Sequence, residues 1–323
     1  MHALMNFSLF RGSIFVLVLL GVVTRADAQT CNFSFQDAVF GQTDITGSAS
    51  TDTTGGLKVN CNGDPDSLVL VCASLGAGNG ETVIGTSRKM NHTSSPSQLS
   101  YNVYVDPSRT TVWGDALQGG SVPDIVVPLN STGNGAITST YYARIPSPQS
   151  DASVGEYSVS LTGSDVAIRY GYLPVGVTCA TANLAQTATT AFNLFASVAP
   201  RCSLSGTDMN FGLLMSLSIA ATATAQLNVR CTKNVSYQIS MNGGESNATD
   251  PTQRWLGGTS GISYGLYQDS NHSTPWGSDV GQTKKGVATG LAEVHTVYGR
   301  TNPSNKLLAA GDYKDKVVVT LIY

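Results

Sequence analysis

The amino-acid sequence predicts an all-β protein made of two tandem antiparallel β-sandwiches. Three observations support this: apolar and polar residues alternate with a period of two, the chain repeats its own motifs in order, and four of its six cysteines recur at matched intervals. The alternation is clear over residues 99–105 and 157–161, and clusters of Gly, Asn, Asp and Pro separate such stretches. Short alternating stretches with almost no helical periodicity indicate strands with one buried face and favour sandwiches.

The chain is long enough for two domains and carries few charges. Of 323 residues, 18 are Lys or Arg and 21 are Asp or Glu, which gives a net charge of −3. The charged fraction of 12% is about half the usual value for a soluble domain. This weak charge argues against a nucleic-acid partner, and two cores of ordinary size need no metal or cofactor in order to fold.

Residues 1–28 have the features of an export signal. Arg11 precedes an apolar run over 14–23 that is too short to span a bilayer, and Ala26 and Ala28 provide a small-x-small cleavage pattern. We therefore expect cleavage after Ala28 and export of the mature chain.

An internal repeat divides the mature chain into two copies of one domain. Each copy begins with a cysteine, reaches a Phe-Gly pair and then a second cysteine, and the two cysteine intervals are 30 and 29 residues. Further matched motifs follow in the same order in both copies. The matched segments are 88–90 with 254–256, 99–106 with 262–269, 113–115 with 276–279, 142–144 with 298–300 and 155–157 with 311–313. We expect a first domain over 29–179, a linker and lead-in strand over 180–200, and a second domain over 201–323.

Six cysteines in an exported chain predict three disulfides. In each copy the matched pair would tie the first strand to the second, and the two cysteines without a counterpart pair most simply with each other. The expected disulfides are Cys31 with Cys61, Cys202 with Cys231, and Cys72 with Cys179. Sequence spacing by itself does not fix the connectivity.

The two copies differ most at their ends. After residues 155–161 the first copy turns at 162–165 and continues into a further apolar stretch, 166–173, whereas the second copy stops at Tyr323. We therefore expect two immunoglobulin-like sandwiches, the second one strand short and completed by donor-strand complementation, in which a strand from another protein fills the gap. The side chains expected beside this gap are Val317, Val319, Leu321 and Tyr323.

A segment ahead of the second domain has the pattern of such a donor strand. Phe192, Leu194, Ala196 and Val198 occupy alternate positions just before Cys202. Because the segment is internal to the chain, it either completes the first domain or begins the second, and the sequence leaves both possibilities open.

The second copy resembles the spore coat protein U domain, the pilin module of archaic (Csu-type) chaperone-usher pili. The resemblance covers nearly all of residues 192–323, and its points of match are Cys202, Phe211-Gly212, Cys231-Thr232, Tyr264, Tyr267, Trp276-Gly277 and residues 297–300, 310–313 and 317–323. The first copy resembles a longer, divergent version of the same module. A two-domain chain of this kind looks like the tip adhesin of such a pilus.

The resemblance implies a set of partners and a location. A periplasmic chaperone would lend the missing strand, an outer-membrane usher would export the complex, and the N-terminal strand of an adjacent pilin would replace the chaperone. The chain would pass through the periplasm to the cell surface, at the tip of a pilus. Only Gln29 and Thr30 would precede Cys31 after cleavage, so we expect a chain that accepts a strand but donates none.

The first domain is where the sequence predicts attachment. Tip domains of the family are associated with hydrophobic loops that grip abiotic or apolar surfaces, which would support attachment to an abiotic or host surface and biofilm formation. The candidate surface-binding residues are Val122, Ile125, Val126, Val127 and Leu129, with Val83 and Ile84 as a second loop. The competing interpretation makes residues 125–129 an inward-facing edge strand of a hairpin.

Two other functions compete with this one, and neither is enzymatic. A carbohydrate-specific lectin tip would use Tyr101, Tyr104 or Trp113 beside Asp106, but the recurrence of these residues in the second copy favours a structural role. A secreted, spore-coat-like protein would assemble without an usher. The histidines are scattered and no H-E-x-x-H or G-x-S-x-G motif occurs, so we expect no enzyme and no metal site.

Overall fold

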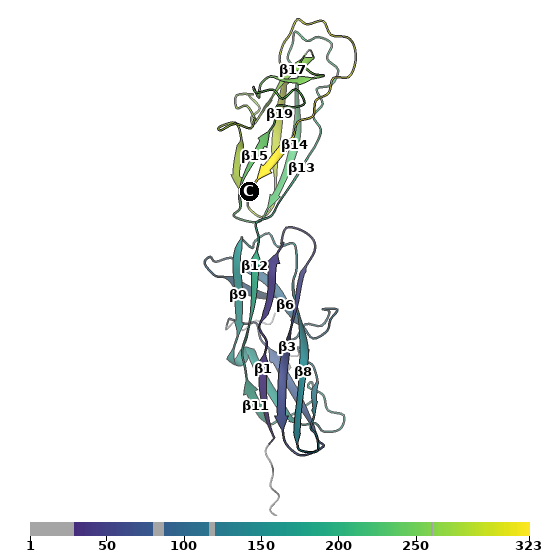
Figure 1. The fold of residues 1–323 in the computed structure, drawn as a ribbon, viewed down its shortest axis with the longest axis vertical. Helices are drawn as coiled ribbons and strands as arrows, with labels where there is room; N and C mark the ends of the chain where they lie inside the picture. Colours follow the sequence, from purple (N-terminus) through teal and green to yellow (C-terminus); the bar gives the residue numbers. More distant parts are fainter. Residues whose placement is uncertain (1–28, 80–86, 116–119, 260) are drawn as a thin grey trace, which may run out of the picture.

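The computed structural model describes residues 29–79, 87–115, 120–259 and 261–323. Two β-sandwiches lie end to end, with the N-terminal sandwich at the bottom of Figure 1 and the C-terminal sandwich at the top. Each sandwich has its own core of buried side chains, one drawn from Phe35 to Val198 and the other from Ala225 to Val297. The all-β, two-domain architecture predicted from the repeat and the alternation is therefore confirmed.

The first sandwich is built from an eight-stranded sheet and a four-stranded sheet. The eight-stranded sheet has the order β1-β3-β8-β6-β5-β9-β12-β2, and the four-stranded sheet has the order β11-β10-β4-β7. The strands are β1 (Thr30–Phe35), β2 (Ala38–Thr43), β3 (Thr51–Asn62), β4 (Leu68–Leu75), β5 (Arg88–His92), β6 (Gln98–Tyr104), β7 (Ile125–Pro128), β8 (Asn134–Ile145), β9 (Gly155–Leu161), β10 (Val166–Tyr172), β11 (Gln186–Thr189) and β12 (Phe192–Val198), with a short 3-10 helix, η2 (Gly163–Asp165), between β9 and β10.

The second sandwich repeats this plan with smaller sheets. A five-stranded sheet, β13-β14-β19-β17-β16, faces a three-stranded sheet, β18-β15-β20. The strands are β13 (Cys202–Gly206), β14 (Thr222–Cys231), β15 (Ser236–Met241), β16 (Arg254–Leu256), β17 (Ile262–Tyr267), β18 (Lys284–Val287), β19 (Ala292–Thr301) and β20 (Val319–Ile322). Burial alternates along the strands, as in β14, because successive side chains point to opposite faces.

The segment at 192–198 belongs to the first sandwich. As β12, it pairs antiparallel with β9 and parallel with β2. Residues 180–200, expected to form a linker and lead-in strand, contain β11 and β12, and β11 pairs with β10 of the first sandwich. Only Ala199, Pro200 and Arg201 lie between the last strand of the first sandwich and β13. Residues 192–198 join the first sandwich because the apolar side of β12 is buried there against the first core.

The terminal strand of the second sandwich corrects the expected position of the gap. The side chain of Trp113 donates to the carbonyl of Ala73, and that of Trp276 donates to the carbonyl of Ile239, so β4 and β15 are equivalent. Since β10 pairs with β4 and β20 pairs with β15, β20 is the counterpart of β10. The second copy therefore does contain the strand that the sequence comparison counted as missing, and its gap lies elsewhere.

The three disulfides join the pairs expected from the sequence. Cys31 lies opposite Cys61 on β1 and β3, and Cys202 lies opposite Cys231 on β13 and β14. The third bond joins Cys72 on β4 to Cys179, 107 positions later in the sequence. It ties the segment that follows β10 back onto the four-stranded sheet.

The junction between the sandwiches is short, and residues of both domains form hydrogen bonds or packing contacts across it. The Thr232 amide donates to the Arg201 carbonyl at 2.9 Å, next to the start of β13. Ser153 of the first domain forms a β-bridge with Lys233 of the second, and Val154 packs against the second core. The end of β12 is thereby connected almost directly to the second sandwich.

Candidate functional site

The central feature of the first sandwich is the strand that closes it. The side chains of Phe192, Leu194, Ala196 and Val198 on β12 are all buried in the first core. Phe192 stacks on Phe35, with ring centroids 4.6 Å apart. Between β9 and β2, this strand supplies both backbone pairing and four apolar side chains. A sandwich of this plan is complete only when that position is occupied.

The same position in the second sandwich has no strand among the described residues. The Phe-Gly motif places Phe211 where β2 has Phe40, and the Gly-x-Tyr motif places residues 311–317 where β9 lies. Neither 207–221 nor 311–317 forms a strand. Phe40 is buried in the first core, whereas Phe211 only packs partly buried against the second. The missing element of the second domain is therefore the counterpart of β12.

Apolar side chains are left open along this gap. We call the set Leu204, Met209, Phe211, Val317, Val319 and Leu321, which pack against the second core while staying half-exposed, the open face. Flanking residues are more exposed still: Leu213 is 86%, Met215 87% and Leu307 100% exposed. Apolar surface of this kind beside unpaired backbone is the signature of a site that accepts a strand.

Of the four residues predicted to lie beside the gap, three do so. Val317, Val319 and Leu321 belong to the open face, and Tyr323 at the end of the chain is 53% exposed. Three of the four therefore line the core under the gap, although Val319 and Leu321 do so from β20, and Val317 from two residues before it. The sequence analysis missed Met209 and Phe211, for which the repeated Phe-Gly motif was the available signal.

The structure contradicts the predicted exposure of three residues of the surface-binding cluster in the first domain. Ile125 and Val127 on β7, together with Leu129, are buried in the first core. Val122 and Val126 pack instead around the disulfide of Cys72 and Cys179. The strand β7 pairs with β4, and its alternate residues Ile125 and Val127 face the core, as in the competing interpretation of an edge strand. Val83 and Ile84 lie outside the described residues.

The aromatic platform considered for a lectin is also absent. Tyr101 and Trp113 are buried in the first core, and the indole of Trp113 donates to the Ala73 carbonyl at 2.7 Å. Asp106 accepts hydrogen bonds from the amides of Thr110 and Thr111 and so caps a turn. Asp269 makes the matching turn in the second domain with Ser273 and Thr274. Repetition in both copies reflects this structural role.

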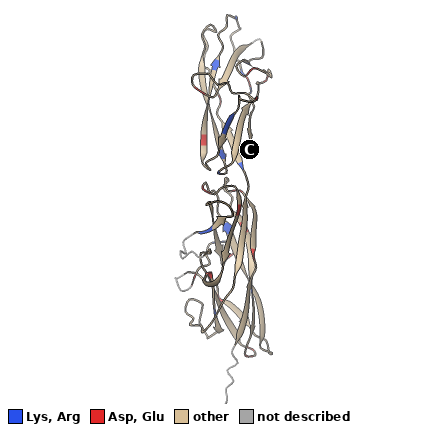
Figure 2. Cartoon of the chain, turned by 90° about the vertical axis from the view of Figure 1, so that its left-hand side faces the viewer, with Lys and Arg blue, Asp and Glu red and all other residues tan. Residues whose placement is uncertain are grey.

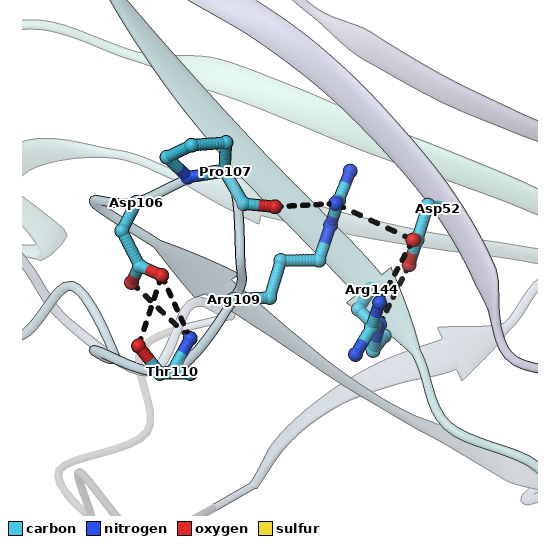
Figure 3. Close-up of polar contacts among 6 residues, drawn as sticks. All are labelled: Asp52, Asp106, Pro107, Arg109, Thr110 and Arg144. Carbon is cyan, nitrogen blue, oxygen red and sulfur yellow. Dashed lines mark hydrogen bonds and ion pairs between the residues drawn. The ribbon is translucent and has the colours of Figure 1, made fainter.

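Charged residues are sparse and interspersed over the molecule (Figure 2). One cluster belongs to the first domain alone (Figure 3): Arg144 donates from Nε to Asp52 Oδ1 at 2.7 Å, and Nη1 of Arg109 lies 3.4 Å from Asp52 Oδ2. Arg109 also donates to the Pro107 carbonyl at 2.9 Å, so the cluster ties the 106–111 turn to β3 and β8. In the second domain, Thr222 stands opposite Arg300 where Asp52 stands opposite Arg144.

This cluster predicts a measurable acid response. Hydrogen bonding from Arg144 holds the pKa of Asp52 below its usual value of 3.8. A lowered folded-state pKa stabilises the fold above the unfolded value, and that stabilisation is lost as the pH falls through the folded one. Because the pair is partly exposed, we expect Asp52→Asn to lower the unfolding free energy of the first domain by only about 0.5–1 kcal/mol at neutral pH.

Urea unfolding at pH 7 and near pH 2 checks this expectation. The difference between wild type and Asp52→Asn should shrink at the acid pH, because protonation of the wild-type carboxylate removes the same interaction. In an Arg144→Gln background the Asp52 substitution should have little further effect. An equal difference at both pH values would contradict an electrostatic role.

Within the described ranges, no helix is long and apolar enough to cross a membrane. The same residues contain no group of three or more His, Cys, Asp or Glu side chains placed to hold a metal ion.

Comparisons with known proteins agree with the fold. The family profile described as the Spore Coat Protein U domain matches residues 18–163 and 188–320. Protein U of Myxococcus xanthus is 30% identical over 156 residues, which cover 43% of this chain and 87% of that protein.

Solved structures with a similar arrangement are more distant. The chaperone-tip adhesion subunit complex CsuC-CsuE, from the archaic Csu pili of Acinetobacter baumannii, is 17% identical with a TM-score of 0.48, covering 91% of this chain and 100% of that one. The CupB6 tip adhesin of Pseudomonas aeruginosa is 12% identical with a TM-score of 0.34, covering 90% and 94%. The profile spans most of both sandwiches, and the chain belongs to the Spore Coat Protein U domain family.

Proposed function

We propose that this chain is the tip adhesin subunit of an archaic chaperone-usher pilus. The observation that carries the proposal is the contrast between the two domains. The first is closed by its own β12, whereas the second lacks the equivalent strand and exposes the open face. A chain built this way accepts one strand from a partner, and it does so in its second domain only.

The energetics favour such a partner. Burying about four apolar side chains at roughly 1.5–3 kcal/mol each would contribute on the order of 10 kcal/mol before the cost of ordering the strand. In the proposed sequence of events, a periplasmic chaperone first covers the open face. The chain then passes an outer-membrane usher, and the N-terminal strand of the adjacent pilin replaces the chaperone. The mature protein would stand at the cell surface, at the tip of the pilus.

The first domain, which needs no partner strand, would carry attachment to an abiotic or host surface and so support biofilm formation. Its buried apolar residues on β7 take no part in this proposal. The free end of the domain, opposite the junction, is the surface that a tip subunit would present (Figure 1).

One observation at that end supports a carbohydrate-specific tip as a second candidate. A cavity of about 430 Å³ is lined by Tyr170, Tyr172, Leu184 and Gln29, among others. Gln29 is only 7% exposed, and its Oε1 has no hydrogen-bond partner among the described residues. Aromatic rings beside an unused acceptor suit a sugar hydroxyl. Glycan-array binding that is lost in Tyr172→Ala, with the fold intact, would favour this candidate over attachment to bare plastic.

Expression of residues 29–323 in a periplasm, with and without the neighbouring pilus chaperone, tests the acceptor role. We expect soluble protein only with the chaperone, and we expect a synthetic peptide copied from the N-terminus of the adjacent pilin to displace it. The peptide complex should melt at a higher temperature than the chaperone-free chain. A soluble, monomeric chain that ignores both the chaperone and the peptide would instead favour a coat-like protein that assembles without an usher.

A further inference from the structure

We propose that Tyr313 selects the partner strand by requiring a small residue opposite its ring, and that β12 of the first domain shows the register of that strand. The expected partner has inward residues at alternate positions, of which the first is large and the third is small. Its second inward residue lies opposite Asp315, the counterpart of Val159. This inference rests on the proposed acceptor role of the second domain and names the chemistry of its ligand.

The first domain supplies the register. Along β12, Phe192 pairs with Leu161, Leu194 with Val159, Ala196 with Tyr157, and Val198 with Gly155. The smallest of the four inward side chains therefore stands opposite the largest side chain of β9. In a close-packed interior, these two volumes have to be complementary.

Tyr313 is held in the second domain as Tyr157 is held in the first. The Tyr157 hydroxyl donates to the carbonyl of Ser153, four residues earlier, at 2.7 Å. The Tyr313 hydroxyl donates to the carbonyl of Ala309, also four residues earlier and also at 2.7 Å. Both rings are thus anchored from the same side by the same hydrogen bond.

The backbone beside Tyr313 confirms the equivalence. In the first domain β5 pairs with β9 at Asn91 and Ser158. In the second, the Gly257 amide donates to the Lys314 carbonyl at 2.8 Å, one residue beyond the tyrosine as in the first domain. Tyr313 therefore lies beside the open position, at the place that Tyr157 has opposite Ala196, except that no described strand covers it.

The end of the open position that corresponds to Phe192 has smaller neighbouring side chains than the same place in the first domain. Phe192 fits between Phe35 and Tyr141 in the first core. Counting from the matched cysteines and tyrosines, the second domain has Gly206 and Val297 at these places. A large first residue, Phe or bigger, is therefore the expected occupant there, while the third residue has to be small.

The pairing of β12 also sets the direction of the partner. It runs antiparallel to β9 and parallel to β2. A partner strand should accordingly run antiparallel to residues 311–317, with its first large residue near Val317 and its last near Gly311.

Peptides that copy residues 190–199 test the inference on the mature chain, residues 29–323. Binding of the labelled peptide is measured by fluorescence anisotropy, and its location by hydrogen exchange at 208–214 and 311–317. We expect binding with new protection in both segments. The same peptide carrying Ala196→Leu should bind about tenfold more weakly or worse, because overpacking a fixed site is destabilising. The matched peptide carrying Phe195→Leu, changed on the outward side, should bind as the parent does.

Variants of the chain complete the design. Tyr313→Ala should restore binding of the Ala196→Leu peptide, and Tyr313→Phe, which keeps the ring, should keep the discrimination. Equal binding of the parent and Ala196→Leu peptides to the wild-type chain would overturn the role of Tyr313 while leaving the acceptor role intact. If neither these peptides nor the N-terminal peptide of the adjacent pilin protects 311–317, the acceptor role itself fails.

Discussion

Replacing Leu194 by Asp is expected to unfold the first sandwich, although the residue lies outside the repeated motifs that define the domain. Leu194 is fully buried on β12, between β9 and β2, in a core of apolar side chains. A carboxylate there would be desolvated without a partner, and the cavity left by the leucine adds to the cost. We expect a loss of roughly 4 kcal/mol or more, enough to remove the first-domain transition.

The matched control is Phe195→Asp, one residue further along the same strand. Phe195 points away from the core and is 40% exposed, so a charge there stays hydrated. Its effect should stay within about 1 kcal/mol. Differential scanning calorimetry of the two variants separates the outcomes. A Leu194→Asp chain that kept the first transition and lost the second would show that β12 supports the second domain instead.

Replacing Arg254 by Met is expected to have a comparable effect on the second sandwich. Arg254 is completely buried, and its guanidinium donates to the carbonyls of Asn242 and Trp276, both at 2.8 Å. Truncating it to an apolar chain leaves these carbonyls without donors inside the core. We expect the free energy of unfolding to fall by about 3–5 kcal/mol, in a domain that already lacks a strand.

Two further substitutions control this prediction. Arg88 makes the same contacts in the first domain, to the carbonyls of Leu75, Gly76 and Trp113, so Arg88→Met should destabilise the first domain and spare the second. Arg300 is exposed on β19, and Arg300→Met should change little. The measurement is urea unfolding of each variant bound to its chaperone or to a peptide. Equal effects of Arg254→Met and Arg300→Met would refute a structural role for the buried arginine.

The course of β12 shows where sequence reasoning stops. The alternation of Phe192, Leu194, Ala196 and Val198 identifies a strand with one buried face, but it does not name the core that the face covers. Both neighbouring sandwiches offer an apolar surface. The choice depends on partners that are distant in sequence, since β2 and β9 lie more than 30 residues away from β12 along the chain.

The β7 strand shows how an apolar segment of the core can be mistaken for an exposed binding loop. Residues 125–129 lie in an insertion relative to the second copy, and an apolar insertion suggested an exposed binding loop. The pairing of β7 with β4 turns Ile125 and Val127 into core residues. Apolar composition predicts that a segment is buried. Whether it is buried in its own domain or against a partner depends on whether a strand edge of the same domain is free to pair with it.

The sequence by itself determined the class of the fold and the tandem repeat, because both are expressed in local periodicity and matched spacing. It also predicted the cysteine pairs and an incomplete second sandwich, without fixing the connectivity or the missing strand. Only the tertiary structure decided which strand is missing, which domain β12 completes and which apolar residues stay open. These depend on strand neighbours, and neighbours in a sheet are chosen by the burial of side chains from segments far apart in the chain.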